Sequence, residues 1–96
     1  MDELVYYNSL YDLYKNLLTE KQCEYFEDYY FNNLSLSEMS ESYNISRNAI
    51  SKQLSTIRSK LDEYELKLNL YNKNNKILEL IKDEKLKNEI MDILFP

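Results

Sequence analysis

The sequence lacks glycine, histidine and tryptophan, and its 96 residues include a single proline and a single cysteine. Glycine is the residue that most easily adopts a positive φ, so primed hairpin turns would have to rely on asparagine or aspartate. The only proline, Pro96, is the last residue and interrupts no element. These absences disfavour a β-rich fold and favour an all-α one.

The same absences exclude several kinds of reactive site. Without histidine and with one cysteine, the chain has neither a Ser-His-Asp nor a Cys-His nucleophile, and it lacks the usual ligands of a zinc site. A glycine-rich phosphate loop is impossible in a chain without glycine. We therefore expect no metal, no cofactor and no enzymatic activity.

Two groups of acidic residues could be drawn as carboxylate sites. They are Glu24, Glu27 and Asp28, and Asp62, Glu63 and Glu65. No histidine or cysteine partner is available for acid–base chemistry, so we interpret both groups as solvated helix faces.

The length of 96 residues predicts one helical domain spanning residues 1–96. A lone cysteine forms no internal disulfide, which is typical of a cytosolic protein. No apolar run approaches the ~18 residues that a membrane span needs. The beginning of the chain, MDELVYYNSL, is acidic and has no signal-peptide pattern. We expect a cytoplasmic protein that does not enter a membrane.

Apolar spacing and capping residues predict the helices. We expect a first helix over about 3–16, and a second from a capping box at Thr19 and Gln22 to about Phe31. A second capping box, Ser35 with Glu38, opens the third helix, which Asn44 can end in the left-handed conformation. The polar stretch NKNNK (72–76) is expected to break a helix. Two short C-terminal helices, at about 77–81 and 86–94, form an extension over about 74–96, with Asp83 capping the last.

The fourth helix is predicted to be the longest, from Arg47 after the Ser46 cap to about Asn72. Its apolar residues follow 4-3 spacing from Ile50 and Leu54 onward, as in a coiled-coil seam. The later members of the seam are Ile57, Leu61, Tyr64, Leu68 and Tyr71. A helix this long exceeds what a three-helix core covers, so we expect a homodimer along the seam. The alternative is that the first helix and the C-terminal helices bury the seam within one chain.

The stretch from Leu36 to Ser55 has the spacing of a helix-turn-helix. Ser40 is the small residue where the two helices would cross, and Asn44 is the best substitute for glycine in the turn. Four apolar residues would lock the second helix onto the first: Met39, Ile45, Ile50 and Leu54. The first turns of the second helix would then face outward, as in a DNA recognition helix.

Charge supports this interpretation locally. The net charge is −5, yet residues 42–61 hold four basic residues and no acidic one. Arginine and asparagine contact guanine and adenine edges in pairs of hydrogen bonds, and serine and lysine contact bases or phosphates. We expect the major groove of DNA to be read by Arg47, Asn48, Ser51, Lys52 and Ser55. Arg58 and Lys60, further along the helix, are expected to contact phosphates.

Residues 18–71, LTEKQCEYFEDYYFNNLSLSEMSESYNISRNAISKQLSTIRSKLDEYELKLNLY, resemble the YlxM-type proteins. These are small bacterial helix-turn-helix proteins whose genes neighbour those of the signal recognition particle. The hairpin and the helix before it also resemble region 4 of bacterial sigma factors, which reads promoter DNA. The resemblance implies an all-helical DNA-binding fold and a role in signal recognition particle-dependent protein targeting or its regulation.

Two functional hypotheses follow. The first is a homodimeric regulator that binds double-stranded DNA in a sequence-specific way. The second is an adaptor that binds RNA or protein components of the signal recognition particle without reading DNA. The net charge and the small basic set favour the second, whereas the outward face of the predicted recognition helix favours the first.

Overall fold

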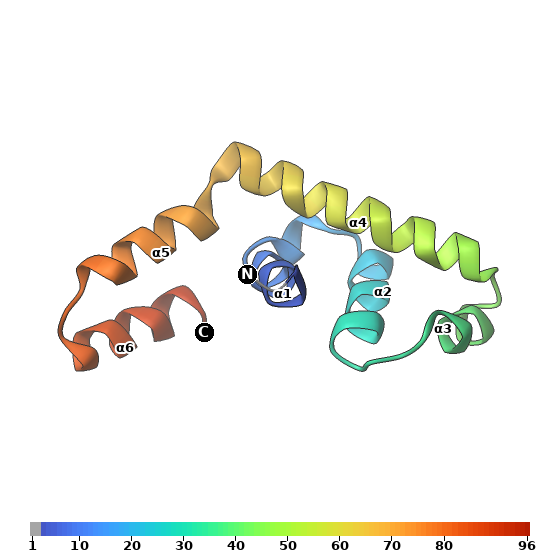
Figure 1. The fold of residues 1–96 in the computed structure, drawn as a ribbon, viewed down its shortest axis with the longest axis horizontal. Coiled ribbons are helices and arrows are strands. Elements are labelled where there is room, and N and C mark those ends of the chain that lie inside the picture. The colour runs from blue at the N-terminus through green and yellow to red at the C-terminus, as the bar shows by residue number, and fades with distance from the viewer. Residues whose placement is uncertain (1–2) are drawn as a thin grey trace.

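The computed structural model describes residues 3–96, and every regular element in this range is helical. The elements are α1 (Glu3–Tyr14), the 3₁₀ turn η1 (Lys15–Leu17), α2 (Glu20–Tyr30), α3 (Leu36–Tyr43), α4 (Arg47–Leu68), α5 (Leu70–Leu80) and α6 (Glu84–Leu94). The all-α prediction is confirmed. The molecule is elongated, 50 × 25 × 24 Å, with α4 lying across α1, α2 and α3 (Figure 1).

The predicted helix caps are confirmed. Both capping boxes form, because the Thr19 and Ser35 hydroxyls accept the backbone N–H three residues later while Gln22 and Glu38 accept the cap N–H in return. The Ser46 hydroxyl accepts the Ala49 N–H at 3.0 Å. At α6, the Asp83 carboxylate accepts two backbone N–H groups.

Asparagine supplies the positive φ that glycine usually provides. Three asparagines take left-handed backbone angles: Asn33 at φ 58°, Asn44 at φ 56° and Asn69 at φ 58°. Asn33 lies in the link between α2 and α3, Asn44 follows α3, and Asn69 separates α4 from α5. A short polar side chain tolerates this region better than most residues do, so the chain turns at these points without glycine.

The predicted end of the fourth helix is wrong. α4 stops at Leu68, and the NKNNK stretch lies inside α5 rather than breaking a helix. The Glu65 carboxylate accepts the Tyr71 and Asn72 N–H groups at 3.0 and 3.2 Å, so it caps α5 from the preceding helix. Asn69 with φ 58° gives the chain its change of direction. The new helix therefore begins within two residues of the old one.

Other helix bounds differ from the predicted ones at their ends. α1 stops at Tyr14, where the chain tightens into η1 instead of continuing to residue 16. The C-terminal helices are each longer than predicted, since they span 70–80 and 84–94. The C-terminal extension thus begins at residue 70, not at about 74.

The hydrophobic core lies where α1, α2 and α3 pack on α4. Its fully covered side chains are Leu10, Tyr14, Phe26, Met39, Ile50, Ile57 and Leu61. Ile57 and Leu61 belong to the predicted coiled-coil seam, and both have 0% exposure within one chain. The intramolecular alternative therefore holds for these two residues, which are not available to a second copy.

Tyrosine hydroxyl groups join the helices by donating to carboxylates. Four such bonds lie within residues 3–96. Tyr7 to Asp62 and Tyr14 to Glu65 join α1 to α4, Tyr11 to Glu27 joins α1 to α2, and Tyr43 to Asp28 joins α3 to α2. The Tyr14 hydroxyl also accepts the Leu70 N–H at 3.1 Å, so it holds the start of α5 as well. Tyr7 and Tyr14 of α1 thus bind α4, whereas Tyr11 binds α2.

These bonds make stability sensitive to alkaline pH. Burial, and then the hydrogen bonds to Asp62 and Glu65, raise the pKa of Tyr7 and of Tyr14 from 10.0 to about 12. A group with a raised pKa in the folded state stabilises the fold fully below its unfolded pKa and loses that contribution as pH rises through the folded value. We expect the free energy of unfolding to fall between pH 10 and about 12, with a smaller fall in Tyr14→Phe. Urea denaturation across this range, checked against pH 8, tests this; a flat profile would contradict it.

Candidate nucleic-acid interface

The turn between α3 and α4 is held by hydrogen bonds of Ser40. Its hydroxyl donates to the Ile45 carbonyl at 2.5 Å, and its own carbonyl accepts the Ile45 N–H at 3.2 Å. Asn44 takes the left-handed conformation between them, and Ser46 then caps α4. The whole link is three residues long, as the helix-turn-helix motif requires. The left-handed conformation predicted for Asn44 is confirmed, and the hydrogen bonds of Ser40 add to what the sequence predicted.

The inner face of α4 is fixed against the rest of the domain core. Met39 of α3 and Ile50 of α4 have 0% exposure, Leu54 has 2%, and Ile45 is half-buried between the two helices. With these residues covered, the opposite face of α4 must point to solvent. This end of the molecule, formed by α3 and the start of α4, is the one furthest from α5 and α6 (Figure 1).

The residues predicted to read DNA lie together at the start of α4. All five are exposed: Arg47, Asn48, Ser51, Lys52 and Ser55. Within residues 3–96 neither Arg47 nor Lys52 takes part in an ion pair, and their charges face solvent. The Ser46 hydroxyl accepts the N–H of Ala49, and the N–H groups of Arg47 and Asn48 come before it at the start of α4. Backbone N–H groups at the start of a helix attract phosphate.

The distribution of charge singles out this end of α4. Residues 1–41 carry two basic and nine acidic side chains, a net of −7, whereas residues 42–61 carry four basic ones alone, a net of +4. Glu38 and Glu41 of α3 are exposed and are the nearest acidic residues before this segment. A polyanion would therefore be attracted to the start of α4 and repelled by much of α1 and α2.

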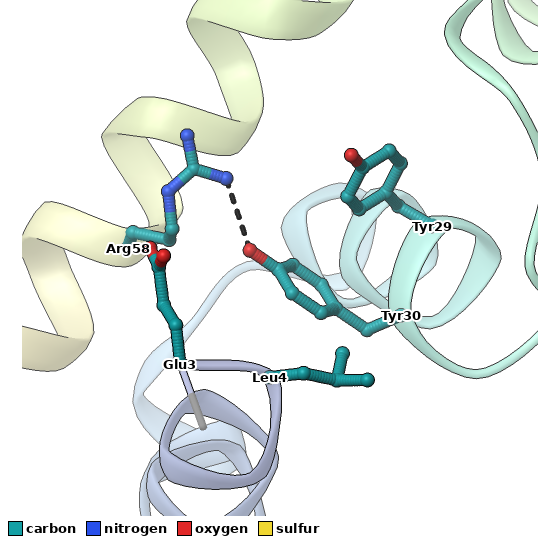
Figure 2. Close-up of a pocket in the computed structure, with 5 residues that line it drawn as sticks. All are labelled: Glu3, Leu4, Tyr29, Tyr30 and Arg58. Atoms are coloured by element: carbon teal, nitrogen blue, oxygen red, sulfur yellow. Dashed lines mark hydrogen bonds between the residues drawn. The ribbon is translucent and has the colours of Figure 1, made fainter. Parts of the chain in front are cut away.

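Arg58 and Lys60 lie on different sides of α4: Arg58, eleven residues after Arg47, lies nearly in line with it, and Lys60 lies away from the other five residues. Two residues apart on an α-helix, their side chains point about 200° from each other around the axis. Arg58 is half-buried, and its guanidinium donates to the Tyr30 hydroxyl at 3.0 Å. Figure 2 shows this bond at the edge of a hollow that Glu3, Leu4 and Tyr29 also line. Arg58 therefore connects α4 to α2 in the folded chain.

The Arg58–Tyr30 bond was missed by sequence reasoning. The two residues are 28 positions apart, and no local spacing relates them. The sequence indicates only that α2 ends in two adjacent tyrosines, Tyr29 and Tyr30. A tyrosine hydroxyl needs a hydrogen-bond partner when its ring is covered.

The two acidic groups serve the fold. Glu27, Asp28, Asp62 and Glu65 each accept a tyrosine hydroxyl. Glu24 pairs with Lys21 at 3.3 Å and Glu63 with Lys67 at 2.8 Å. The interpretation as solvated faces is thus wrong for Asp28 and Glu65, which are half-buried, whereas Glu27 and Asp62 are exposed and also connect two helices.

Across residues 3–96, no three potential ligands from histidine, cysteine, aspartate and glutamate come close enough together to hold a metal ion. In the same range, none of the helices has the length and apolar character needed to span a bilayer.

Comparison with known proteins gives the same motif. The sequence model of a family described as "Putative helix-turn-helix protein, YlxM / p13 like" matches residues 1–94. A UPF0122 protein of Ureaplasma parvum serovar 3 is 45% identical over 91 residues, which cover 92% of each chain. UPF0122 proteins of Malacoplasma penetrans and Halalkalibacterium halodurans are 40% and 37% identical over 86 residues, 86% of this chain and 80% and 79% of theirs.

Proposed function

Because the chain belongs to the YlxM / p13-like family of helix-turn-helix proteins, we propose that it binds double-stranded DNA through the start of α4 and regulates transcription. The observation that carries the proposal is the outward face of α4. Five exposed polar or basic residues (47, 48, 51, 52 and 55) lie on a helix whose opposite face is fixed by buried Ile50 and Leu54. A rigid helix with a free polar face can enter the major groove without rearrangement.

Each residue has a role in this proposal. Arg47 and Asn48, in the first turn of α4, would contact base edges, since their side chains form paired hydrogen bonds with guanine and adenine. Lys52, with Ser51 and Ser55, would contact the next bases or the flanking phosphates. The backbone N–H groups at the start of α4 would receive a phosphate. The acidic surface of α1 and α2 would weaken non-specific binding, which depends on neutralising phosphates.

We further propose a cytoplasmic homodimer that acts in, or regulates, signal recognition particle-dependent targeting. The resemblance to YlxM-type proteins supports the link to this pathway. The net charge of −7 over residues 1–41 supports a second candidate, an adaptor whose acidic surface meets basic components of the particle. No catalytic step belongs to either candidate.

Replacing Arg47 with alanine tests the DNA-reading role. We expect Arg47→Ala to weaken binding to the preferred duplex by about 1–3 kcal/mol, about 5- to 150-fold, and to relax preference at one base pair. Fluorescence anisotropy with the preferred duplex and its single-base variants measures both effects. An equal loss on every duplex would assign Arg47 to phosphate.

Arg58→Ala is the matched control because it removes the same charge from the same helix. Its guanidinium is bonded to Tyr30, so we expect a loss of stability rather than of sequence preference. Unchanged DNA binding in Arg47→Ala, or relaxed preference in Arg58→Ala instead, would contradict the assignment.

A further inference from the structure

The C-terminal arm, residues 70–94 comprising α5 and α6, covers little of its own apolar surface. Of the fourteen large hydrophobic side chains that are exposed within residues 3–96, six lie in the arm. Among the described residues, α6 has no buried side chain and α5 has one, Leu78. The arm leaves the end of α4 and folds back as an antiparallel hairpin on the side of α1 away from α2 and α3 (Figure 1). Exposed apolar surface concentrated in this way marks an interaction site.

The exposed apolar residues of the two helices lie on one face of the arm. In each helix the covered residues, such as Leu78 of α5 and Ile90 of α6, mark the contact side. The exposed stripes, Leu70, Ile77 and Leu80 on α5 and Leu86 and Ile93 on α6, lie about a quarter turn from that side in the same rotational sense. Because the helices are antiparallel, equal rotations reach the same side of the hairpin. Leu80, 80% exposed, and Ile93, 77% exposed, are the most open.

Opposite charges border this face. Lys73 and Lys76 lie along its α5 edge, and Glu89 and Asp92 lie along its α6 edge, with Lys85 one turn before Glu89. All four edge residues are exposed, and none forms an ion pair within residues 3–96. The segment 69–96 carries five basic and five acidic side chains, so it is neutral, unlike residues 1–41 with their net of −7.

We propose that this face binds the same face of a second copy of the chain. The two arms would pack about a twofold axis parallel to the hairpin, with each α5 lying over the partner's α6. At a rise of about 1.5 Å per residue, this places Leu80 level with the partner's Leu86, and the partner's Ile93 then lies at a level midway between Leu70 and Ile77. Lys76 then lies level with the partner's Glu89, and Lys73 with the partner's Asp92.

The charge pattern favours a second copy of the chain as the partner that binds this face. A twofold interface joins one patch to itself, so a patch with one basic and one acidic edge complements itself twice. The ion pairs lie at the rim, where they add little affinity but set register and orientation. The arm is also the neutral part of an acidic chain, so packing one arm against another brings together no excess of like charge. This dimer uses a different surface from the predicted seam, of which Ile57 and Leu61 are buried.

A rotation about this twofold axis leaves positions along the hairpin unchanged. The arm and the α3–α4 turn lie at opposite ends of the chain (Figure 1), so the two α4 recognition ends would lie at the same end of the dimer, away from the arms. This consequence for half-site spacing rests on the proposed DNA binding, whereas the association of the arms does not. A dimer that binds no DNA would overturn the proposed function and leave the interface standing.

Sedimentation equilibrium over a range of concentrations tests the apolar face. We expect wild type to reach twice the 11.7 kDa mass of one chain, and the double variant Leu80→Glu, Ile93→Glu to remain at 11.7 kDa with unchanged helical circular dichroism. Leu66→Glu is the matched control, because Leu66 is 85% exposed but lies on α4 outside the face, and it should remain dimeric. A monomeric wild type, or a dimer that the Leu80 and Ile93 substitutions leave intact, would overturn the proposal.

Charge exchange tests the pairing of α5 with the partner's α6. One variant carries Lys73→Glu and Lys76→Glu, so both edges are acidic; the other carries Glu89→Lys and Asp92→Lys, so both are basic. At low salt each variant alone should lose most of its dimer, and an equal mixture should recover it as a heterodimer. Two variants that dimerise as well alone as when mixed would exclude this register.

Discussion

Phe26→Ala is expected to lower the free energy of unfolding by about 3–5 kcal/mol, the range measured for truncating a buried phenylalanine. Phe26 has 0% exposure and stacks between Tyr11 and Tyr30, with ring centroids 4.2 and 4.3 Å away. Alanine would leave a cavity at the meeting point of α1, α2 and α4. Small domains have only about 5–15 kcal/mol of stability in total, so this variant would unfold at much lower denaturant concentrations.

Phe31→Ala provides the matched comparison, since the same atoms are removed from a side chain that is 48% exposed. Urea denaturation of wild type and both variants measures the difference. Equal losses for the two variants would show that the aromatic stack around Phe26 is not the centre of the core. A loss below about 1 kcal/mol in Phe26→Ala would show the same.

The stack also matters for the interface. Tyr30 packs on Phe26 and its hydroxyl accepts the Arg58 guanidinium, so the aromatic cluster helps to hold α4 on α2. The outward face at the start of α4 depends on this support, because a helix that shifts on its core no longer presents a fixed set of side chains.

The combined substitution Arg47→Ala and Lys52→Ala is expected to have the largest effect on DNA binding. Each contact is worth about 1–3 kcal/mol to a correct base, and the two residues lie on successive turns of α4. If the losses add, binding weakens by about 2–6 kcal/mol, which is at least a ~30-fold loss of affinity. Neither side chain has an ion pair within the described residues 3–96, so stability should be nearly unchanged.

The control for charge is Lys73→Ala with Lys76→Ala, which removes the same net charge from the C-terminal arm. We expect it to bind a single half-site as wild type does, because it leaves α4 intact. Titration of both double variants with one half-site duplex measures the difference. Equal losses would mean that total charge, rather than the start of α4, controls binding.

Local signals in the sequence predicted the helix-turn-helix accurately. The capping boxes, the Ser46 cap and the left-handed Asn44 depend on hydrogen bonds between residues at most a few positions apart, so the sequence shows both partners together. The buried residues Met39, Ile50 and Leu54 follow from helical periodicity in the same way.

Long-range contacts account for what the sequence did not show. The break after Leu68 depends on the Tyr14 hydroxyl, 51 positions before Glu65, and on a glutamate that reads as a solvated residue. In the sequence, Arg58 likewise resembles a phosphate contact, because only the folded chain places Tyr30 of α2 next to it. Periodicity shows that a helix has an apolar face but not what covers that face. The seam was therefore expected to bind a second copy, although α1 covers its central residues within one chain.

Selection from a random pool of DNA duplexes at about 100–150 mM salt, with wild type beside the Arg47→Ala, Lys52→Ala variant, tests the proposed function most directly. Specific binding outlasts phosphate-only contacts in this range of salt. The proposed function predicts an enriched motif for wild type that the double variant fails to enrich. No motif for wild type, or the same motif for both proteins, would contradict DNA reading by α4, and the absence of any motif would favour the adaptor.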